Sequence, residues 1–548
     1  MLSRFSMSGR LLSACCLVLQ IAVCVVHAAN CSTRSFPPLL DATLDELRRG
    51  LDGGQFTSVD LTKAYIARIN DVNEQLHAVN EINPDALKIA AELDQERAKG
   101  KVGPLHGIPI LIKDNIATDD KMNNTAGSFA LIGAKVPEDS TVAAKLRKAG
   151  AIILGKANLS QWAYFRSDNG SSGWTSVGGQ TIGAYFPGQD PSGSSSGSGV
   201  ASSVGLAWAC LGTETDGSII SPSQENNIVG IKPSVGLTSR YLVVPISEHQ
   251  DTVGPMARTV KDAAHLLSAI AGKDNHDNYT SAIPFGDEVP DYVAACKESG
   301  LKDKRIGIPR GFANDTGFAP AVVKAFRETI EIMRSSGAVI IEDIEFPGAA
   351  KYGSAKVIVL GADFFTDLPE LYLKNLVTNP NNIHSLADLR AFTQKDSRED
   401  WPERDTGVWD SALKRGYGND SPQFQQAYQE QLLYGGQEGL AGALKNHSLD
   451  AVFAPSGIAS SLAAPLGHPA VTLPIGRMPE GTLVTQNGFG NLNATSPNQP
   501  FGVGFAGDYF SEEALIGMAY ALEQQTQVRT KIEPIVVPKT ELKDVVGK

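Results

Sequence analysis

Two serines and a lysine stand in a pattern that could carry covalent catalysis. The first serine lies in a Ser- and Gly-rich tract at residues 191–199, and the second, Ser218, closes the segment GTETDGS at residues 212–218. Lys113 ends an apolar run that begins at Gly107. A hydroxyl nucleophile needs a base, and a lysine acts as a base only where water is scarce enough to keep its amine neutral. The trio therefore points to acyl transfer through a serine.

The segments around these residues must position them. A lysine at a strand end is more often solvated, but the apolar residues before Lys113 predict a buried strand end, where the pKa of the amine falls. A Ser/Gly tract is more often a linker. This one runs into a small-residue helix pattern at residues 200–207, and a glycine-rich turn that opens a helix offers free backbone N–H groups. The loop at residues 212–218 can turn its own N–H groups toward an oxyanion.

Helix and strand patterns alternate along the chain. Residues 140–149 predict a helix with one apolar face, Gly150 ends it, and residues 151–154 predict a buried strand. Short apolar strands between amphipathic helices favour an α/β fold in which helices flank a sheet. The same order recurs in helix and strand patterns at residues 319–335 and 338–341, and again at residues 436–445 and 450–454.

The N-terminus has the features of a secretory signal peptide over residues 1–28. Arg4 and Arg10 are basic, residues 11–26 are mostly apolar, and Ala28 closes a small-residue cleavage site. A membrane anchor is the alternative, but the apolar run is shorter than the roughly 20 residues that a spanning helix needs. We therefore expect cleavage after Ala28, a secreted (extracellular) protein and no stable membrane span.

We interpret residues 29–548 as one large domain, because no convincing linker divides them. Residues 377–425, which are rich in charge, Asn and Trp, predict a helical insertion or lid. The tail after Arg529 carries several prolines and alternating charge, and we expect it to wrap the surface.

Composition narrows the classes of function. The 548-residue chain has a formal net charge of −12 and no clusters of Lys and Arg, which argues against a nucleic-acid partner. Its histidines form no ligand motif, so we expect no metal and no cofactor. After cleavage Cys31, Cys210 and Cys296 remain, and the sequence leaves their disulfide state open. Nine Asn-x-Ser/Thr sequons suggest a glycoprotein, and they begin at Asn30, Asn123, Asn158, Asn169, Asn278, Asn314, Asn419, Asn446 and Asn493.

Several motifs together resemble the amidase signature family, over roughly residues 60–530. The serine segments at residues 193–198 and 212–218 look most like the bacterial peptide amidase branch. The resemblance implies a single large α/β domain with a mixed, twisted β-sheet flanked by helices on both faces. The other motifs are GIPILIKDN at residues 107–115, TAGS at 125–128, AGAIILGKAN at 149–158, VGIKPS at 229–234, GPMAR at 254–258 and HPAVTLP at 468–474.

The resemblance also implies roles by position. Ser218 matches the nucleophile, Ser194 the bridging serine behind a cis peptide bond, and Lys113 the base. The implied reaction is hydrolysis of a carboxamide C–N bond, through a serine acyl-enzyme, to a carboxylate and an amine or ammonia. The implied oxyanion hole consists of the backbone N–H groups of Thr215, Asp216, Gly217 and Ser218.

The chain departs from the commonest family pattern at three positions. Asp216 and Ser196 stand where glycine is usual, and Ile220 stands where many members have arginine. The peptide amidase branch shares such changes, so we expect them to bear on substrate choice rather than on the chemistry.

Alternative functions remain at this stage. A glutamine amidotransferase subunit would share the fold, but the signal peptide and the acidic balance argue against it. An esterase could use Ser195 in the G-x-S-x-G segment at residues 193–197, although residues 185–191 make a poor strand before it. A secreted binding protein on the same scaffold is the third alternative. The sequence leaves open whether the substrate is a peptide amide, a fatty-acid amide or a small amide, and whether the protein is a monomer or a homodimer.

Overall fold

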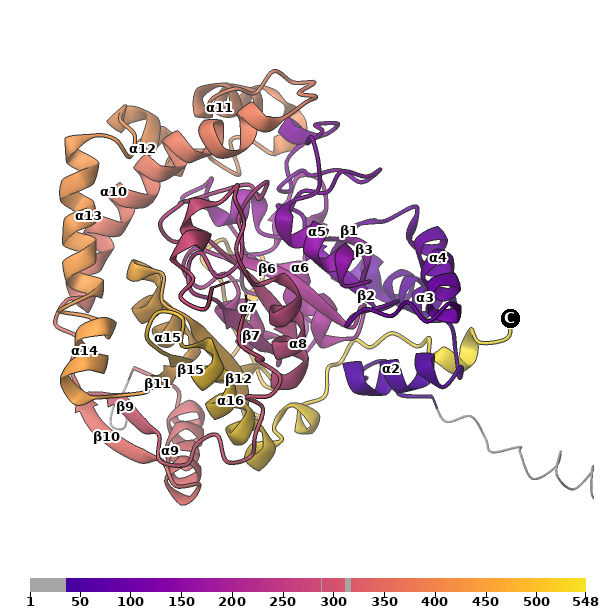
Figure 1. Ribbon diagram of the computed structural model, residues 1–548. Helices are drawn as coiled ribbons and strands as arrows, with labels where there is room; N and C mark the ends of the chain where they lie inside the picture. The colour runs from indigo at the N-terminus through magenta and orange to yellow at the C-terminus, as the bar shows by residue number, and fades with distance from the viewer. Residues whose placement is uncertain (1–35, 287, 311–316) are drawn as a thin grey trace, which may run out of the picture.

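The computed structural model describes residues 36–548, apart from residue 287 and residues 311–316. The predicted signal peptide at residues 1–28, Cys31 and the sequons at Asn30 and Asn314 therefore lie outside the described residues. The framework is an eleven-stranded sheet with helices on both faces (Figure 1). This confirms the predicted α/β fold.

The central sheet mixes parallel and antiparallel pairs, which makes it a mixed sheet as expected. In spatial order its strands are β1 (Val79–Ile82), β3 (Ile152–Ala157), β2 (Pro109–Lys113), β6 (Ala209–Glu214), β8 (Thr252–Ala257), β7 (Val229–Lys232), β12 (Ala470–Arg477), β15 (Pro500–Ala506), β11 (Ala451–Pro455), β9 (Arg305–Pro309) and β10 (Val339–Ile344). Strands β3, β2 and β6 are parallel, and so are β11, β9 and β10. The strands between these two groups pair in antiparallel fashion.

Helices pack on the sheet in groups. One group contains α5 (Thr141–Lys148), α8 (Val260–Ile270), α9 (Pro320–Ser335) and α16 (Glu512–Thr526). A second group contains α6 (Ser196–Ser203), α7 (Ile220–Glu225) and α15 (Ser456–Ala463). Near the β1 edge lie α3 (Ser58–Leu76) and α4 (Ala86–Ala98). The short helix α2 (Leu44–Asp52) begins beside α8, where the Leu44 N–H donates to Asp262 at 3.0 Å.

The predicted pairs of a helix followed by a strand are confirmed, with small shifts at the ends of these elements. Between α5 and β3, Gly150 has φ +86, and a Cβ there would lie 2.8 Å from the Cα of His106, so only glycine fits this turn. Gly337, with φ +90, makes the corresponding turn between α9 and β10. The third predicted helix begins later than expected, as α14 (Leu440–His447), because residues 436–439 form a turn after α13 (Pro422–Gly435) in which Gly436 and Gly439 have non-helical backbone angles.

A long helical segment connects β10 to β11 and contains the residues predicted as an insertion. It comprises α10 (Ala349–Asp367), α11 (Leu386–Lys395), α12 (Gly407–Arg415), α13 and α14, and it forms the orange arc around the sheet in Figure 1. A buried ion pair between Glu399 and Arg166, 3.2 Å apart, ties the arc to the segment after β3. Ser128 also donates to Glu399, at 2.7 Å. The arc is therefore fastened to the half of the sheet that carries Lys113.

The end of the chain packs beside its start. Glu541 accepts from the Leu39 N–H at 2.8 Å and pairs with the buried guanidinium of Arg68 at 2.9 Å. Leu542 is fully buried. The tail thus follows the surface, as expected, and is anchored there. Among the described residues, no helix has the length and apolar character needed to cross a bilayer.

Candidate active site

Lys113 ends β2, between β3 and β6, and its side chain is fully buried. Its Nζ contacts Ser194 Oγ at 2.7 Å, Thr213 Oγ1 at 2.8 Å and Thr213 O at 3.2 Å. An ammonium has three N–H donors, whereas a neutral amine has two and a lone pair that can accept a proton. Because two of the three partners are hydroxyls, which both donate and accept, this site suits either protonation state of the lysine.

The surroundings of Lys113 favour its neutral form. Burial lowers the pKa of Lys113 from 10.5 to about 7, and the negative charges of Asp251 and Glu214 oppose this shift. At a pKa near neutrality, a substantial fraction of the amine is uncharged under physiological conditions. Lys113 therefore has the protonation chemistry of a general base.

The Ser/Gly-rich tract is an ordered turn at the start of α6. The peptide bond between Gly193 and Ser194 is cis, as the resemblance implied. Ser194 is fully buried, and its carbonyl accepts from the Ser160 N–H at 2.9 Å. The neighbouring Ser195 hydroxyl exchanges hydrogen bonds with the backbone of Thr213, at 3.1 and 3.2 Å. Ser195 thus holds the tract against β6, while the Ser194 hydroxyl contacts Lys113.

Glu214, the last residue of β6, shapes the loop that carries Ser218. Its buried carboxylate accepts the N–H groups of Gly217, Ile219 and Ile220, at 2.9, 2.7 and 2.8 Å. The hydroxyl of Ser460 adds a fourth bond at 2.6 Å. These bonds turn the chain back on itself directly after the strand.

Ser218 lies beside the Ser/Gly tract. The Ser195 N–H donates to the Ser218 carbonyl at 3.1 Å, which holds the two segments together. Ser218 is 9% exposed and lines a cavity. In the described part of the chain, no hydrogen bond joins the Ser218 hydroxyl to that of Ser194. The fold thus gathers the three predicted residues, and of the two predicted hydroxyl contacts it forms the one between Lys113 and Ser194.

The predicted oxyanion loop is tied to its neighbours by side chains. The Gly217 N–H is used by Glu214, as described above. On one side of the loop the Thr215 hydroxyl donates to Asp251 at 2.6 Å. On the other side, Asp216 forms an ion pair with Lys356 of α10. The helical arc therefore contacts the same loop that carries Ser218.

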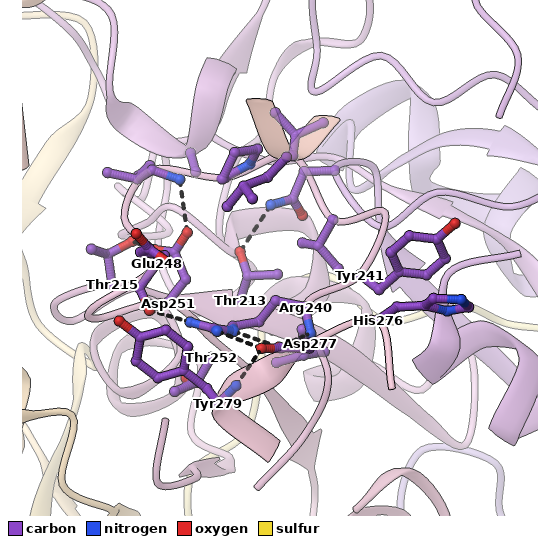
Figure 2. Close-up of a pocket in the computed structure, with 18 of the residues that line it drawn as sticks. Thr213, Thr215, Arg240, Tyr241, Glu248, Asp251, Thr252, His276, Asp277 and Tyr279 are labelled. Atoms are coloured by element: carbon purple, nitrogen blue, oxygen red, sulfur yellow. Dashed lines mark hydrogen bonds and ion pairs between the residues drawn. The ribbon is translucent and has the colours of Figure 1, made fainter. Parts of the chain in front are cut away.

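Two cavities adjoin along this loop, and Ala163, Thr215 and Ile246 line both. The nucleophile cavity, of about 330 Å³, is lined by Ser218 and Asp216 on one side and by residues of α10 and α12 on the other. The lysine-side cavity, of about 400 Å³, reaches Thr213 and Asn115. Figure 2 shows the residues that line this second cavity, Thr213 and Thr215 among them.

Sequence reasoning did not find Thr213, Asp251 or Lys356. Thr213 lies within the segment that predicted the nucleophile, so its position in that segment, two residues before Thr215, was the available signal. Asp251 and Lys356 reach the loop from 36 and 140 residues away along the chain. Only the packing of the sheet and the arc brings them there.

A model of the amidase family matches residues 60–516. The chain therefore belongs to the amidase (amidase signature) family, and it is a hydrolase that acts on amide C–N bonds.

Relatives of known name extend over nearly the whole chain. A putative amidase of Arthroderma benhamiae is 50% identical over 533 residues, covering 93% of this chain and 89% of its own. The X-ray structure of the peptide amidase of Stenotrophomonas maltophilia superposes with a TM-score of 0.81 at 37% identity, covering 92% of this chain and 100% of its own. A glutamyl-tRNA(Gln) amidotransferase subunit from Geobacter is 30% identical over 507 residues, covering 91% of this chain and 100% of its own.

Proposed function

We propose that this protein is a secreted amidase that hydrolyses a carboxamide through an acyl-enzyme on Ser218, with Ser194 and Lys113 as the proton relay. The observation that carries this proposal is the fully buried amine of Lys113, 2.7 Å from the Ser194 hydroxyl. The similarity to a peptide amidase over 92% of the chain supports the same chemistry.

The proposed reaction begins with neutral Lys113. It takes the proton of Ser194, Ser194 takes that of Ser218, and Ser218 Oγ attacks the carbonyl carbon. The proton returns through Ser194 to the leaving nitrogen, the C–N bond breaks, and water later hydrolyses the ester. The relay requires the Ser194 and Ser218 hydroxyls to come within hydrogen-bond distance, and contacts of this kind commonly tighten when substrate binds.

The backbone N–H groups of the loop would stabilise the oxyanion of the tetrahedral intermediate. We assign this role to Thr215, Asp216 and Ser218 in the first place, because the fourth predicted group, the Gly217 N–H, is already directed to Glu214. One such donor contributes roughly 3–4 kcal/mol to transition-state stabilisation in other serine hydrolases.

A pair of serine variants tests the assignment of the nucleophile. Ser218→Ala should lower kcat by about 10⁴-fold or more with an unchanged fold, because it removes the group that forms the covalent bond. Ser195→Ala should have a much milder effect, since its hydroxyl bonds only to backbone. The measurements are steady-state hydrolysis of a panel of peptide, long-chain and small amides, and labelling by a fluorophosphonate. If Ser218→Ala keeps full activity, or if Ser195→Ala is the variant that loses activity, the esterase interpretation would be favoured instead.

The similarity to an amidotransferase subunit supplies a second candidate, delivery of ammonia to a bound partner. The acidic net charge of −12 gives it little support. Turnover of simple amides by the isolated chain would favour the hydrolase. Glutaminase activity that appears only in a stable complex with a partner would favour the amidotransferase.

Secretion rests on the signal-like N-terminus and the sequons. Asn169 and Asn446 are exposed and suited to glycosylation, whereas Asn158 is fully buried and its amide donates to Thr181 Oγ1 at 3.0 Å. Expression in a eukaryotic host should yield protein in the medium that loses mass on deglycosylation and carries no glycan on Asn158. Retention of the whole product inside the cells would contradict the proposal.

A further inference from the structure

The lysine-side cavity is larger than the release of ammonia requires. A molecule the size of water or ammonia occupies about 30 Å³, whereas this cavity measures about 400 Å³. Its lining includes Leu371, on the connection that follows α10, and the tilted rings of Tyr241 and His276, whose centroids are 4.2 Å apart. Thr213, Thr215 and Asp251 also line it (Figure 2). The cavity therefore has room for a substrate fragment of several heavy atoms.

The two cavities lie on different sides of the reacting groups. Ser218, which would hold the acyl carbon, lines only the nucleophile cavity. Thr213, which contacts the amine of Lys113, lines only the lysine-side cavity. The leaving nitrogen must receive its proton from the relay that ends at Lys113, so it should face the side on which that relay lies. The shared residues Ala163, Thr215 and Ile246 mark where the two halves of a substrate would meet.

We propose that the lysine-side cavity binds the amine half of an N-substituted amide, while the acyl half occupies the nucleophile cavity. This inference rests on the proposed function and names its substrate class as secondary amides. In the reaction, the bond between the carbonyl carbon and nitrogen breaks as Ser218 Oγ bonds to that carbon. The proton of Ser218 passes through Ser194 to the nitrogen, and a free primary amine leaves through the cavity. Water then cleaves the ester and regenerates the Ser218 hydroxyl.

The charges in the cavity favour an amine half with a positive group. The basic side chains Arg240 and Lys374 of the lining are both paired. Arg240 forms two bonds of 2.7 Å with Asp277, and Lys374 forms an ion pair of 3.0 Å with Glu370. Glu248 and Asp251 also line the cavity, and among the described residues neither has a cationic side chain within ion-pair distance. Asp251 is occupied by the Thr215 hydroxyl and by backbone N–H groups, whereas the Glu248 carboxylate contacts the amide of Asn419 at 3.2 Å. Glu248 is therefore the carboxylate best placed to attract a cation.

A matched substrate series tests the proposal on the unmodified protein. It combines one acyl group with four amines: the primary amide, the N-propyl amide, its isostere the N-(2-aminoethyl) amide, and the N-carboxymethyl amide. We expect kcat/KM for the N-(2-aminoethyl) amide to lie within about tenfold of the primary amide. It should exceed that of the N-carboxymethyl amide by about tenfold or more, since an anion would meet the Glu248 carboxylate, which has no cationic partner among the described residues.

Two isosteric variants locate the effect. Glu248→Gln should lower the ratio of kcat/KM for the N-(2-aminoethyl) and N-propyl amides by about threefold. Asp168→Asn, an acid that lines only the nucleophile cavity, is the matched control and should leave that ratio unchanged.

The outcomes separate this inference from the proposed function. Hydrolysis of the primary amide with cleavage of all three substituted amides more than about 10³-fold slower, a loss of about 4 kcal/mol, would overturn the inference and leave the amidase function standing. Equal rates for the cationic and anionic amines, or equal effects of the two variants, would overturn the assignment to this cavity. Failure to hydrolyse any of the four amides would contradict the proposed function, and the inference with it.

Discussion

Two strands of the same sheet each end in a buried lysine, and the two lysines have different hydrogen-bond partners. Lys113 ends β2 and Lys232 ends β7, and both side chains are fully buried. Burial lowers the pKa of Lys113 to about 7 and that of Lys232 to about 8. Lys113 contacts two hydroxyls, whereas the contacts of Lys232 are the carbonyls of His468 and Pro233, at 2.7 and 3.3 Å.

The two lysines differ in whether their hydrogen-bond partners carry a proton that the amine can accept. A carbonyl only accepts, so Lys232 serves as a donor that joins β7 to the chain before β12, and no proton faces its lone pair. The Ser194 hydroxyl carries a proton that the neutral amine of Lys113 can take. Burial therefore tunes both lysines, but the identity of the partner decides which of them can act as a base.

The strongest way to break this comparison is to replace each lysine by methionine, which keeps the shape of the chain and removes the amine. Lys113→Met should lower kcat/KM by about 10²- to 10⁴-fold, because it removes the general base. Lys232→Met should keep the activity per folded molecule but lower the free energy of unfolding by about 1–3 kcal/mol, since two buried carbonyls lose their donor. Amide hydrolysis and urea unfolding of both variants measure these effects. Equal losses of activity would show that the partners do not distinguish the lysines.

The pH dependence sharpens the same point. The base must be uncharged, so kcat/KM should rise about tenfold per pH unit below the pKa of Lys113, near 7, and level off above it. The sign is fixed because protonation at low pH removes the lone pair. A pH–rate profile of kcat/KM reports the pKa of the free enzyme. A profile that is flat from pH 5 to 9 would exclude Lys113 as the base.

A smaller effect is expected from Thr213, which holds Lys113 in place. Its hydroxyl contacts Lys113 Nζ at 2.8 Å and accepts from Asn115 at 3.1 Å. Thr213→Val removes both bonds without changing the shape, and should lower kcat by up to about tenfold, as loss of a hydrogen bond between neutral groups would predict. Thr213→Ser, which restores the hydroxyl, is the control and should recover most of the rate. If Thr213→Ser does not recover the rate, packing of the threonine methyl group would explain the loss instead.

The smallest effect should come from the ion pair between Asp216 and Lys356. Their side chains are 11% and 34% exposed, so solvent screens the pair and its contribution should be about 1 kcal/mol or less. Asp216→Asn and Lys356→Met should each lower kcat/KM a few-fold, and the double variant should lose little more, because either change breaks the same contact. Fully additive losses in this double-mutant cycle would mean that the helical arc does not act on the loop through this pair.

The sequence predicted the parts of the site that are local in the chain. Lys113 stands at the end of an apolar strand, and Ser218 at the end of a glycine-bearing loop, so both carry signals in their immediate neighbours. The helices and strands on either side of Gly150 and Gly337 were predictable because they too carry signals in neighbouring residues. The roles of Ser194 and of the cis peptide before it came only from resemblance to a family.

What the sequence did not predict depends on contacts between distant segments. The order of the eleven strands, with antiparallel pairs between two parallel groups, follows from packing that no local pattern encodes. Lys356 lies on α10, and no pattern in the sequence of that helix indicates that it contacts the loop that carries Ser218. The sequence around Asp251 is typical of a turn, and only the fold brings its carboxylate to the hydroxyl of Thr215.

The four hydrogen bonds to Glu214 have a consequence for the energetics of turnover. They hold the loop around Ser218 in one shape through contacts within the protein, independently of any bound amide. The conformational entropy lost in ordering that loop is then spent once, when the chain folds, and not in every catalytic cycle. A preorganised loop of this kind allows more of the substrate's binding energy to lower the barrier itself.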